Sequence, residues 1–97
     1  MLLHTINCAP NSQTIEDCRK ALSAEDAIVL MGDGVYSGLA DSLGSKMLLA
    51  SGASLYAIET DVRAAGIEDN LDPAIIVIDY AGLVTLSERF SRQVAWY

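Results

Sequence analysis

The chain has 97 residues, a length typical of one domain, and we expect residues 1–97 to form it. Six lysines and arginines against thirteen aspartates and glutamates give a net charge of −7, which argues against direct binding to nucleic acid or to an anionic membrane. Hydrophobic residues make up 52% of the chain, enough to form a core and to leave apolar surface for a partner chain.

No apolar run approaches the roughly 20 residues that a membrane-spanning helix requires. The longest runs, Ala27–Met31 and Ala74–Ile78, are far shorter. The first residues also lack the basic start and the long apolar stretch of a signal peptide. We therefore expect a cytoplasmic protein without a membrane partner, in which Cys8 and Cys18 stay reduced.

The first half of the chain alternates predicted strands with helical patterns. A strand is predicted over Leu2–Cys8, followed by a helix that Asn11 or Ser12 caps. The uninterrupted apolar run Ala27–Met31 predicts a strand that is covered on both faces of the sheet. Apolar residues then recur at intervals of four, and the glycines among them predict a helix in two pieces. These apolar positions are Val35, Leu39, Leu43 and Met47.

The second half continues the alternation. Leu55–Ile58 predicts a third strand, Thr60 is expected to cap a short helix after it, and Gly66 to end that helix. Ala74–Ile78 predicts a second fully buried strand. Gln93–Tyr97 predicts a last strand, which the sequence allows to be parallel or antiparallel. The apolar stripe of one more helix consists of Leu83, Leu86 and Phe90. This order predicts an α/β fold, a three-layer sandwich with a five-stranded, mostly parallel sheet.

A glycine-rich segment follows the second predicted strand. Gly32-x-Gly34-x-x-x-Gly38 lies where a dinucleotide could place its phosphates at the N-terminus of a helix. Asp33 would put a negative charge inside such a cradle, and the chain is too short for a nucleotide fold with two halves. We interpret the segment as a turn that leaves a buried strand, and keep a stand-alone small-ligand-binding domain as an alternative.

Cys18 is the candidate site residue, because an accessible thiolate can carry a persulfide sulfur or attack an electrophile. Its place on one helical stripe with Ile15 and Leu22 also fits an inert thiol in the core. Cys8 ends the first strand, where open parallel sheets place their sites, but no base or cation lies near it in sequence. His4, the only histidine, is expected to be hydrogen-bonded within the sheet, and we predict no cofactor and no metal site.

For two further groups of residues, the sequence allows two interpretations of their role. Trp96 and Tyr97 end the chain and belong either to the core or to an aromatic interface. A cluster of acids around one short helix and turn fits a solvated face, or a surface that docks a basic partner. These acids are Glu59, Asp61, Glu68, Asp69 and Asp72.

Several segments are informative through their order and spacing. They are Leu3-His4-Thr5, Val29-Leu30-Met31-Gly32-Asp33-Gly34-Val35-Tyr36, Leu55-Tyr56-Ala57, Asp61-Val62-Arg63-Ala64-Ala65-Gly66, Ile78-Asp79-Tyr80-Ala81-Gly82-Leu83-Val84 and Gln93-Val94-Ala95-Trp96. Together they resemble the TusB/DsrH family of small sulfur-relay proteins over nearly the whole chain. The resemblance implies a DsrE-like fold and a non-catalytic or accessory subunit of a sulfurtransferase complex.

The resemblance also implies partners. They are TusC/DsrF-like and TusD/DsrE-like subunits, which assemble into a heterohexamer and pass persulfide sulfur to a TusE/DsrC-like acceptor. In the Tus branch the sulfur serves 2-thiolation of the wobble uridine of transfer RNA, whereas in the alternative Dsr branch it serves sulfur oxidation. DsrH-type members have a cysteine in the first helix that Cys18 matches, which implies a persulfide carrier there. Cys8 matches no cysteine of the family.

Overall fold

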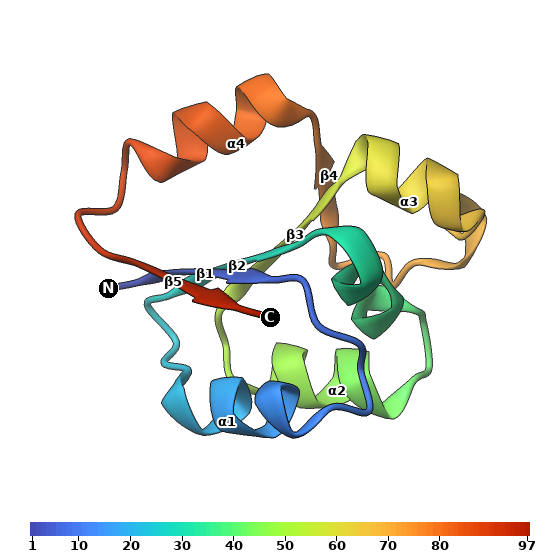
Figure 1. Ribbon diagram of the computed structural model, residues 1–97, viewed down its shortest axis with the longest axis horizontal. Helices are drawn as coiled ribbons and strands as arrows, with labels where there is room; N and C mark the ends of the chain where they lie inside the picture. The colour runs from blue at the N-terminus through green and yellow to red at the C-terminus, as the bar shows by residue number, and fades with distance from the viewer.

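The computed structural model describes residues 1–97 as a parallel sheet between two layers of helices (Figure 1). The strands are β1 (Leu3–Ile6), β2 (Ala27–Leu30), β3 (Ser54–Ile58), β4 (Ile76–Ile78) and β5 (Gln93–Trp96). The helices are α1 (Gln13–Ala21), the 3₁₀ helix η1 (Gly32–Gly38), α2 (Leu43–Ala50), α3 (Glu59–Ala65), the 3₁₀ helix η2 (Glu68–Asn70) and α4 (Tyr80–Ser87). The strand order is β4-β3-β2-β1-β5, and every neighbouring pair is parallel. The predicted α/β fold class is confirmed, and the last strand is parallel like the others.

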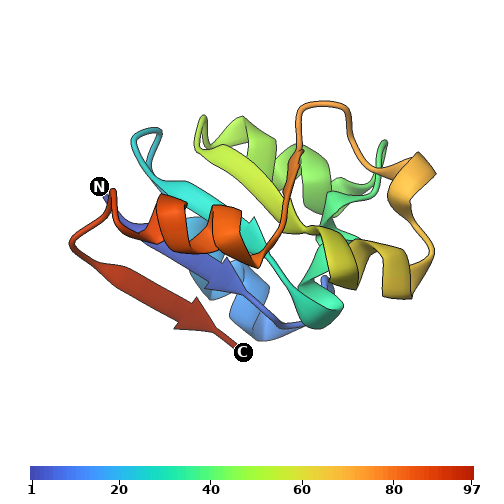
Figure 2. The same cartoon turned by 90° about the horizontal axis from the view of Figure 1, so that it is seen from above.

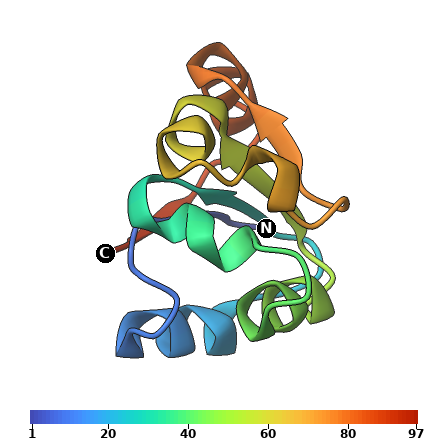
Figure 3. The same ribbon diagram turned by 90° about the vertical axis from the view of Figure 1, so that its right-hand side faces the viewer.

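The parallel register divides the side chains of the sheet between two faces, because successive residues of a strand point to opposite sides. On one face, His4 and Ile6 of β1 lie beside Ile28 and Leu30 of β2, and the larger core forms between them and the helices α1 and α2. On the other face α4 packs a smaller core (Figures 1 and 3). The buried members of this smaller core are Leu3, Ala27, Val29, Ile58 and Leu86.

The helix ends follow local signals in most places. Ser12 caps α1, since its hydroxyl oxygen accepts a hydrogen bond from the backbone N–H of Ile15. Gly66 ends α3 in the left-handed region, with φ of 70°. The prediction that Thr60 caps α3 is wrong, because β3 runs directly into the helix, which begins at Glu59. Its N-cap, Ile58, has no side-chain oxygen to offer.

The prediction of a fully buried strand over Ala74–Ile78 is also wrong. The strand spans only Ile76–Ile78 and lies at an edge of the sheet. Ile76 is 54% exposed and Val77 is 42% exposed. An apolar run without alternation resembles a central strand of a parallel sheet, but it does not reveal whether a second neighbouring strand is present.

The long connection in the fold is made by α4. Strands β4 and β5 lie at opposite edges, so the chain crosses the whole sheet between them (Figure 2). As a result the last strand joins the first, and β5 pairs with β1 from Leu3–Gln93 to Ile6–Trp96. None of the helices is long and apolar enough to span a membrane.

Candidate functional site

Both cysteines lie in the larger core as free thiols. Cys18 is completely buried on the inner side of α1, and Cys8 is buried just after β1. Neither side chain lines any of the three cavities on the surface. The sequence allows Cys18 to be either a sulfur carrier or an inert core residue. In this conformation its surroundings are those of a core residue.

The surroundings of Cys18 disfavour its thiolate. Burial, with smaller contributions from the neighbouring Cys8 and Asp26, raises the pKa of the Cys18 thiol from 9.0 to about 12. The thiolate is the form that attacks an electrophile or takes up sulfur, so Cys18 is a poor nucleophile at neutral pH in this conformation. Sulfur transfer at Cys18 therefore requires a conformation in which α1 exposes it.

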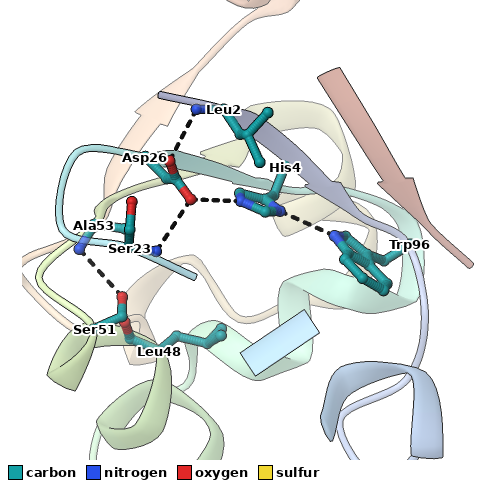
Figure 4. Close-up of polar contacts among 8 residues, drawn as sticks. All are labelled: Leu2, His4, Ser23, Asp26, Leu48, Ser51, Ala53 and Trp96. Atoms are coloured by element: carbon teal, nitrogen blue, oxygen red, sulfur yellow. Dashed lines mark hydrogen bonds and ion pairs between the residues drawn. The ribbon is translucent and has the colours of Figure 1, made fainter. Parts of the chain in front are cut away.

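His4, Asp26 and Trp96 form a hydrogen-bonded chain across the sheet (Figure 4). The His4 Nε2 atom lies 2.8 Å from Oδ2 of Asp26, and the indole Nε1 of Trp96 lies 3.0 Å from Nδ1 of His4. The indole N–H can only donate, so Nδ1 accepts and the ring proton of neutral His4 is on Nε2. The prediction that His4 is hydrogen-bonded within the sheet is confirmed.

Asp26 precedes β2 and was not identified from the sequence. Burial would raise the pKa of its carboxyl group, but hydrogen bonds from His4 and from the backbone N–H groups of Leu2 and Ser23 lower it to about 2. The charged carboxylate thus connects the start of β1, the start of the loop after α1 and the histidine ring. An acidic residue directly before a wholly apolar strand is the signal that could have identified it.

This network resembles a carboxylate–histidine pair of a catalytic site, but both ring nitrogens of His4 are already bonded inside the protein. His4 is fully buried, and Asp26 is 4% exposed. The rings of Trp96 and His4 meet edge to edge and are nearly coplanar, with 6.3 Å between their centroids and 18° between their planes. No surface for a substrate reaches Nδ1, so we assign the network to the fold and not to acid–base catalysis.

The glycine segment forms a turn that the chain itself fills. Gly32 has a φ of 53°, and its N–H donates a hydrogen bond to the carboxylate of Asp61 in α3. A Cβ atom on Gly34 would collide with the backbone carbonyl group of Ile6. The glycines therefore allow close packing of η1 on β1.

The largest surface cavity is an apolar cleft of about 440 Å³ between α1, η1 and α2, here called the α1–α2 cleft. Its apolar lining is contributed by Ile15, Tyr36, Leu39, Leu43, Met47 and Leu48. Its only charged side chains, Glu16 and Arg19, form an ion pair with each other at 3.0 Å. The cleft has the size of a small-ligand site but holds no group of residues suited to bond-making chemistry.

A second set of exposed apolar side chains lies along the edge strand β4 and on α4. Ile76 points to the face of the sheet that α4 covers, whereas Val77 points to the other face. Ile76 and Val77 of β4 and Tyr80 and Val84 of α4 are between 42% and 57% exposed, and we call these four residues the β4–α4 surface. Between Tyr80 and Ser87 the helix α4 has no charged residue. A surface helix normally carries charged or polar residues on its outer side, so the exposed Tyr80 and Val84 make α4 unusual for a surface helix.

Comparison with known proteins gives a consistent result. The family model described as "DsrH like protein" matches residues 9–93. The chain is 34% identical over 95 residues to "Protein TusB" of Pectobacterium carotovorum subsp. carotovorum, covering 98% of this chain and all of the relative. Protein TusB of Photorhabdus laumondii is 32% identical over the same length.

Solved structures share the fold. The ychN protein from E. coli has a TM-score of 0.79 at 14% identity, and the match covers 98% of this chain and 97% of that one. Protein Tm0979 from Thermotoga maritima has a TM-score of 0.69 at 27% identity, with 92% and 93% of the two chains covered. At these identities the structures support the architecture, whereas the sequence relatives carry the information on family.

Proposed function

The chain belongs to the DsrH family, and from this membership we propose that it is the TusB/DsrH-type subunit of a heterohexameric sulfur-relay complex. Residues 1–97 would act as one domain in the cytoplasm, as a non-catalytic or accessory subunit of a sulfurtransferase complex. The proposed partners are TusC/DsrF-like and TusD/DsrE-like subunits, with a TusE/DsrC-like protein as the acceptor of the persulfide sulfur. The relatives are matched over their full length, which supports transfer of the subunit role to the whole chain.

The structural observation that carries this proposal is the β4–α4 surface. An edge strand with exposed apolar side chains is prone to pair with another chain unless something covers it. Here the edge strand β4 is followed by a helix on which Tyr80 and Val84 are exposed as well. Interfaces of permanent complexes resemble a domain core cut in half, and the β4–α4 surface has this composition.

We propose the Tus branch, in which the sulfur goes to 2-thiolation of the wobble uridine of transfer RNA. The support is that the full-length relatives are TusB proteins. The net charge of −7 fits a subunit that does not itself contact the RNA. The alternative is a DsrH-type subunit in sulfur oxidation, with Cys18 as a persulfide carrier.

For Cys18 we keep the carrier role as a proposal with a stated condition. Its burial and raised pKa mean that the thiol can take up sulfur only after α1 moves or the partner subunits rearrange the core. If no such movement occurs in the complex, the sulfur passes over cysteines of the partner subunits and this chain acts as a scaffold. The two cases differ in whether Cys18→Ala abolishes sulfur transfer.

The experiment that tests the proposed interface is co-purification with the two companion subunits. Val84→Asp puts a charge at the centre of the outer side of α4, where burial against a partner would leave it unpaired, and we expect at least a tenfold loss of bound companions. Gln13→Asp adds the same charge at an exposed position of α1 across the sheet and should bind like the wild type. Equal binding by both variants would contradict the assignment of the interface to α4.

The role in transfer RNA has its own test. In a host that lacks its own TusB-type subunit, the wild-type chain should restore 2-thiouridine in transfer RNA, measured by mass spectrometry of nucleosides. The Val84→Asp variant should fail to restore it, whereas Gln13→Asp should succeed. Normal assembly of the complex without restored thiouridine would favour the Dsr branch.

The stand-alone ligand-binding alternative rests on the α1–α2 cleft and no longer on the glycine turn. The cleft has a volume of about 440 Å³ and an apolar lining that suits a small apolar molecule. Fluorescence with an apolar dye, compared between wild type and Leu39→Arg, measures whether the cleft is open to ligands. Dye binding by a chain that ignores both companion subunits would favour this alternative.

A further inference from the structure

The chain has one histidine and one tryptophan, and the structure joins them. His4 belongs to the first strand and Trp96 to the last, 92 residues away, and their side chains meet on the face of the sheet that holds the larger core (Figure 4). Neither residue takes part in the proposed relay, so this contact is independent of the proposed function.

Strand β5 is held by its pairing with one strand and by one side chain that reaches the core. It lies at the edge of the sheet and pairs only with β1. Gln93 and Ala95 are exposed, and Val94 is half-buried. Trp96 is the side chain of β5 that packs against the larger core, and its indole N–H is held by Nδ1 of His4.

We propose that His4 and Trp96 form a proton-sensitive latch that holds β5 on the sheet. The latch needs neutral His4, because Nδ1 must offer a lone pair to the indole N–H. A protonated imidazole has a hydrogen on both ring nitrogens, so its Nδ1–H would face the N–H of Trp96 donor to donor. Protonation therefore removes the hydrogen bond that anchors Trp96 and leaves two buried donors opposed.

The other groups around His4 decide how the ring responds. Asp26, before β2, is the one carboxylate bonded to the ring, and its bond to Nε2 strengthens when the ring becomes cationic. Among the titratable side chains of α1 and of the segment after β1, those of Cys18 and Cys8 belong to this core, and a thiol is either neutral or anionic. Between Gln93 and Trp96, β5 adds no charged side chain. A proton on His4 thus favours the Asp26 side of the network over the Trp96 side.

The consequence is confined to one edge of the sheet. Releasing Trp96 loosens β5 and uncovers the outer edge of β1, while β1 stays tied to β2 along Leu3–Ile6. The bond between His4 and Asp26 keeps the ring in place on the other side. Opening of the latch is therefore a local event and does not require unfolding of the remaining four strands.

The test uses nuclear magnetic resonance of the full-length, ¹⁵N-labelled chain, in which the single histidine ring and the single indole N–H give unambiguous signals. The ring nitrogens should show the Nε2–H tautomer when His4 is neutral. As the pH is lowered stepwise from neutral, the indole resonance should shift with the same midpoint as the ring nitrogens. Over that midpoint, hydrogen-exchange protection of the β5 amides should fall at least tenfold, while that of β2 and β3 changes little.

Three results would overturn the latch. They are an Nδ1–H tautomer of neutral His4, a β5 protection that stays constant while the ring titrates, and a ring that stays neutral until the whole fold unfolds. Protection is compared after removal of the intrinsic pH dependence of amide exchange, so a general acceleration cannot imitate the effect.

Two variants separate the two sides of the ring. His4→Gln places an amide near the Nε2 position, where it can still donate to Asp26, but it offers nothing to Trp96. We expect its β5 amides to exchange fast at every pH. His4→Asn places its carboxamide oxygen near the Nδ1 position, where it can accept from Trp96, so β5 should stay protected without a pH-dependent step.

Trp96→Phe keeps an aromatic ring and removes only the donor, which makes it informative if the His4 variants do not fold. Its β5 amides should lose protection at least tenfold at neutral pH and should no longer respond to protonation of His4. Protection and pH dependence equal to those of the wild type would show that the indole hydrogen bond does not hold β5.

Discussion

The carboxylate of Asp61 accepts a 3.0 Å hydrogen bond from the backbone N–H of Gly32, the first residue of η1. A phosphate bound at this turn would need the same N–H group as its donor. Asp33 lines the same small cavity and adds a second carboxylate. The carboxylate of Asp61 thus occupies the position that a bound anion would take. The glycines allow η1 to pack closely against neighbouring residues.

We therefore predict that the chain does not bind nucleotides. Isothermal titration calorimetry with ATP or NAD at millimolar concentration should give only heat of dilution. Asp61→Asn keeps an acceptor oxygen for Gly32 and removes one charge, and it should also fail to bind because Asp33 remains. Saturable heat with the wild type would refute this view of the turn.

Substituting alanine at two different glycines should lower the free energy of unfolding by different amounts. Gly34→Ala forces a Cβ atom against the carbonyl of Ile6, so η1 has to shift, and we expect a loss of about 3 kcal/mol in the free energy of unfolding. Gly66→Ala has open space around the new atom and suffers only from the left-handed backbone, with a loss of about 1 kcal/mol. Urea denaturation of both variants measures the difference. A larger loss of unfolding free energy for Gly66→Ala than for Gly34→Ala would show that η1 does not pack tightly on β1.

Asp26 predicts a stability that depends on acid pH. Hydrogen bonds to its carboxylate outweigh burial and lower its pKa from 3.8 to about 2, so the carboxylate stabilises the fold above pH 3.8, and this contribution is lost as the pH falls through about 2. Asp26→Asn should lose about 2 kcal/mol at neutral pH, since its amide cannot accept all the donors that face it. The difference from wild type should shrink between pH 4 and pH 2.

The exposed Asp17 on α1 provides the control for this prediction. Asp17→Asn should change the free energy of unfolding by less than about 0.5 kcal/mol over the same pH range. A gap between Asp26→Asn and wild type that stays constant with pH would mean that the charge of Asp26 does not stabilise the fold.

We expect both cysteine thiols to react slowly with alkylating reagents in the isolated chain. Cys18 and Cys8 are buried, and the pKa of Cys18 is raised from 9.0 to about 12, so iodoacetamide should leave both unmodified at neutral pH and label both after addition of urea. Neutral Cys18 stabilises the fold below pH 9, and this contribution declines as the pH rises toward 12.

Intact mass with and without the companion subunits measures whether the thiols become accessible. Labelling of Cys18 only in the complex would support the carrier role, and Cys18→Ala would identify the labelled site. Rapid labelling of the isolated chain would contradict the burial of Cys18.

The sequence was sufficient to locate the five strands along the chain, because apolar runs alternate with turn signals and helical patterns. It was not sufficient for the environment of Ile76 and Val77. Apolar residues at an uncovered edge and in a central strand have the same pattern, and only the three-dimensional order shows that β4 has one neighbour.

The candidate site was predictable only in part. The stripe with Ile15 placed Cys18 on the inner side of α1, but burial by the sheet and the proximity of Asp26 depend on contacts between distant segments. The link between His4 and Trp96 spans almost the whole chain and has no local signal. A contact between distant residues depends on which strands are neighbours in the sheet. The sequence did not determine the direction or the neighbour of the last strand.

Native mass spectrometry of the tagged chain, expressed alone and with its TusC/DsrF-like and TusD/DsrE-like companions, tests the subunit proposal most directly. A discrete heterohexamer with equal numbers of the three chains is the expected result, and Val84→Asp should prevent it while Gln13→Asp should not. A chain that remains monomeric or forms only a homodimer in the presence of both companions would contradict the proposal.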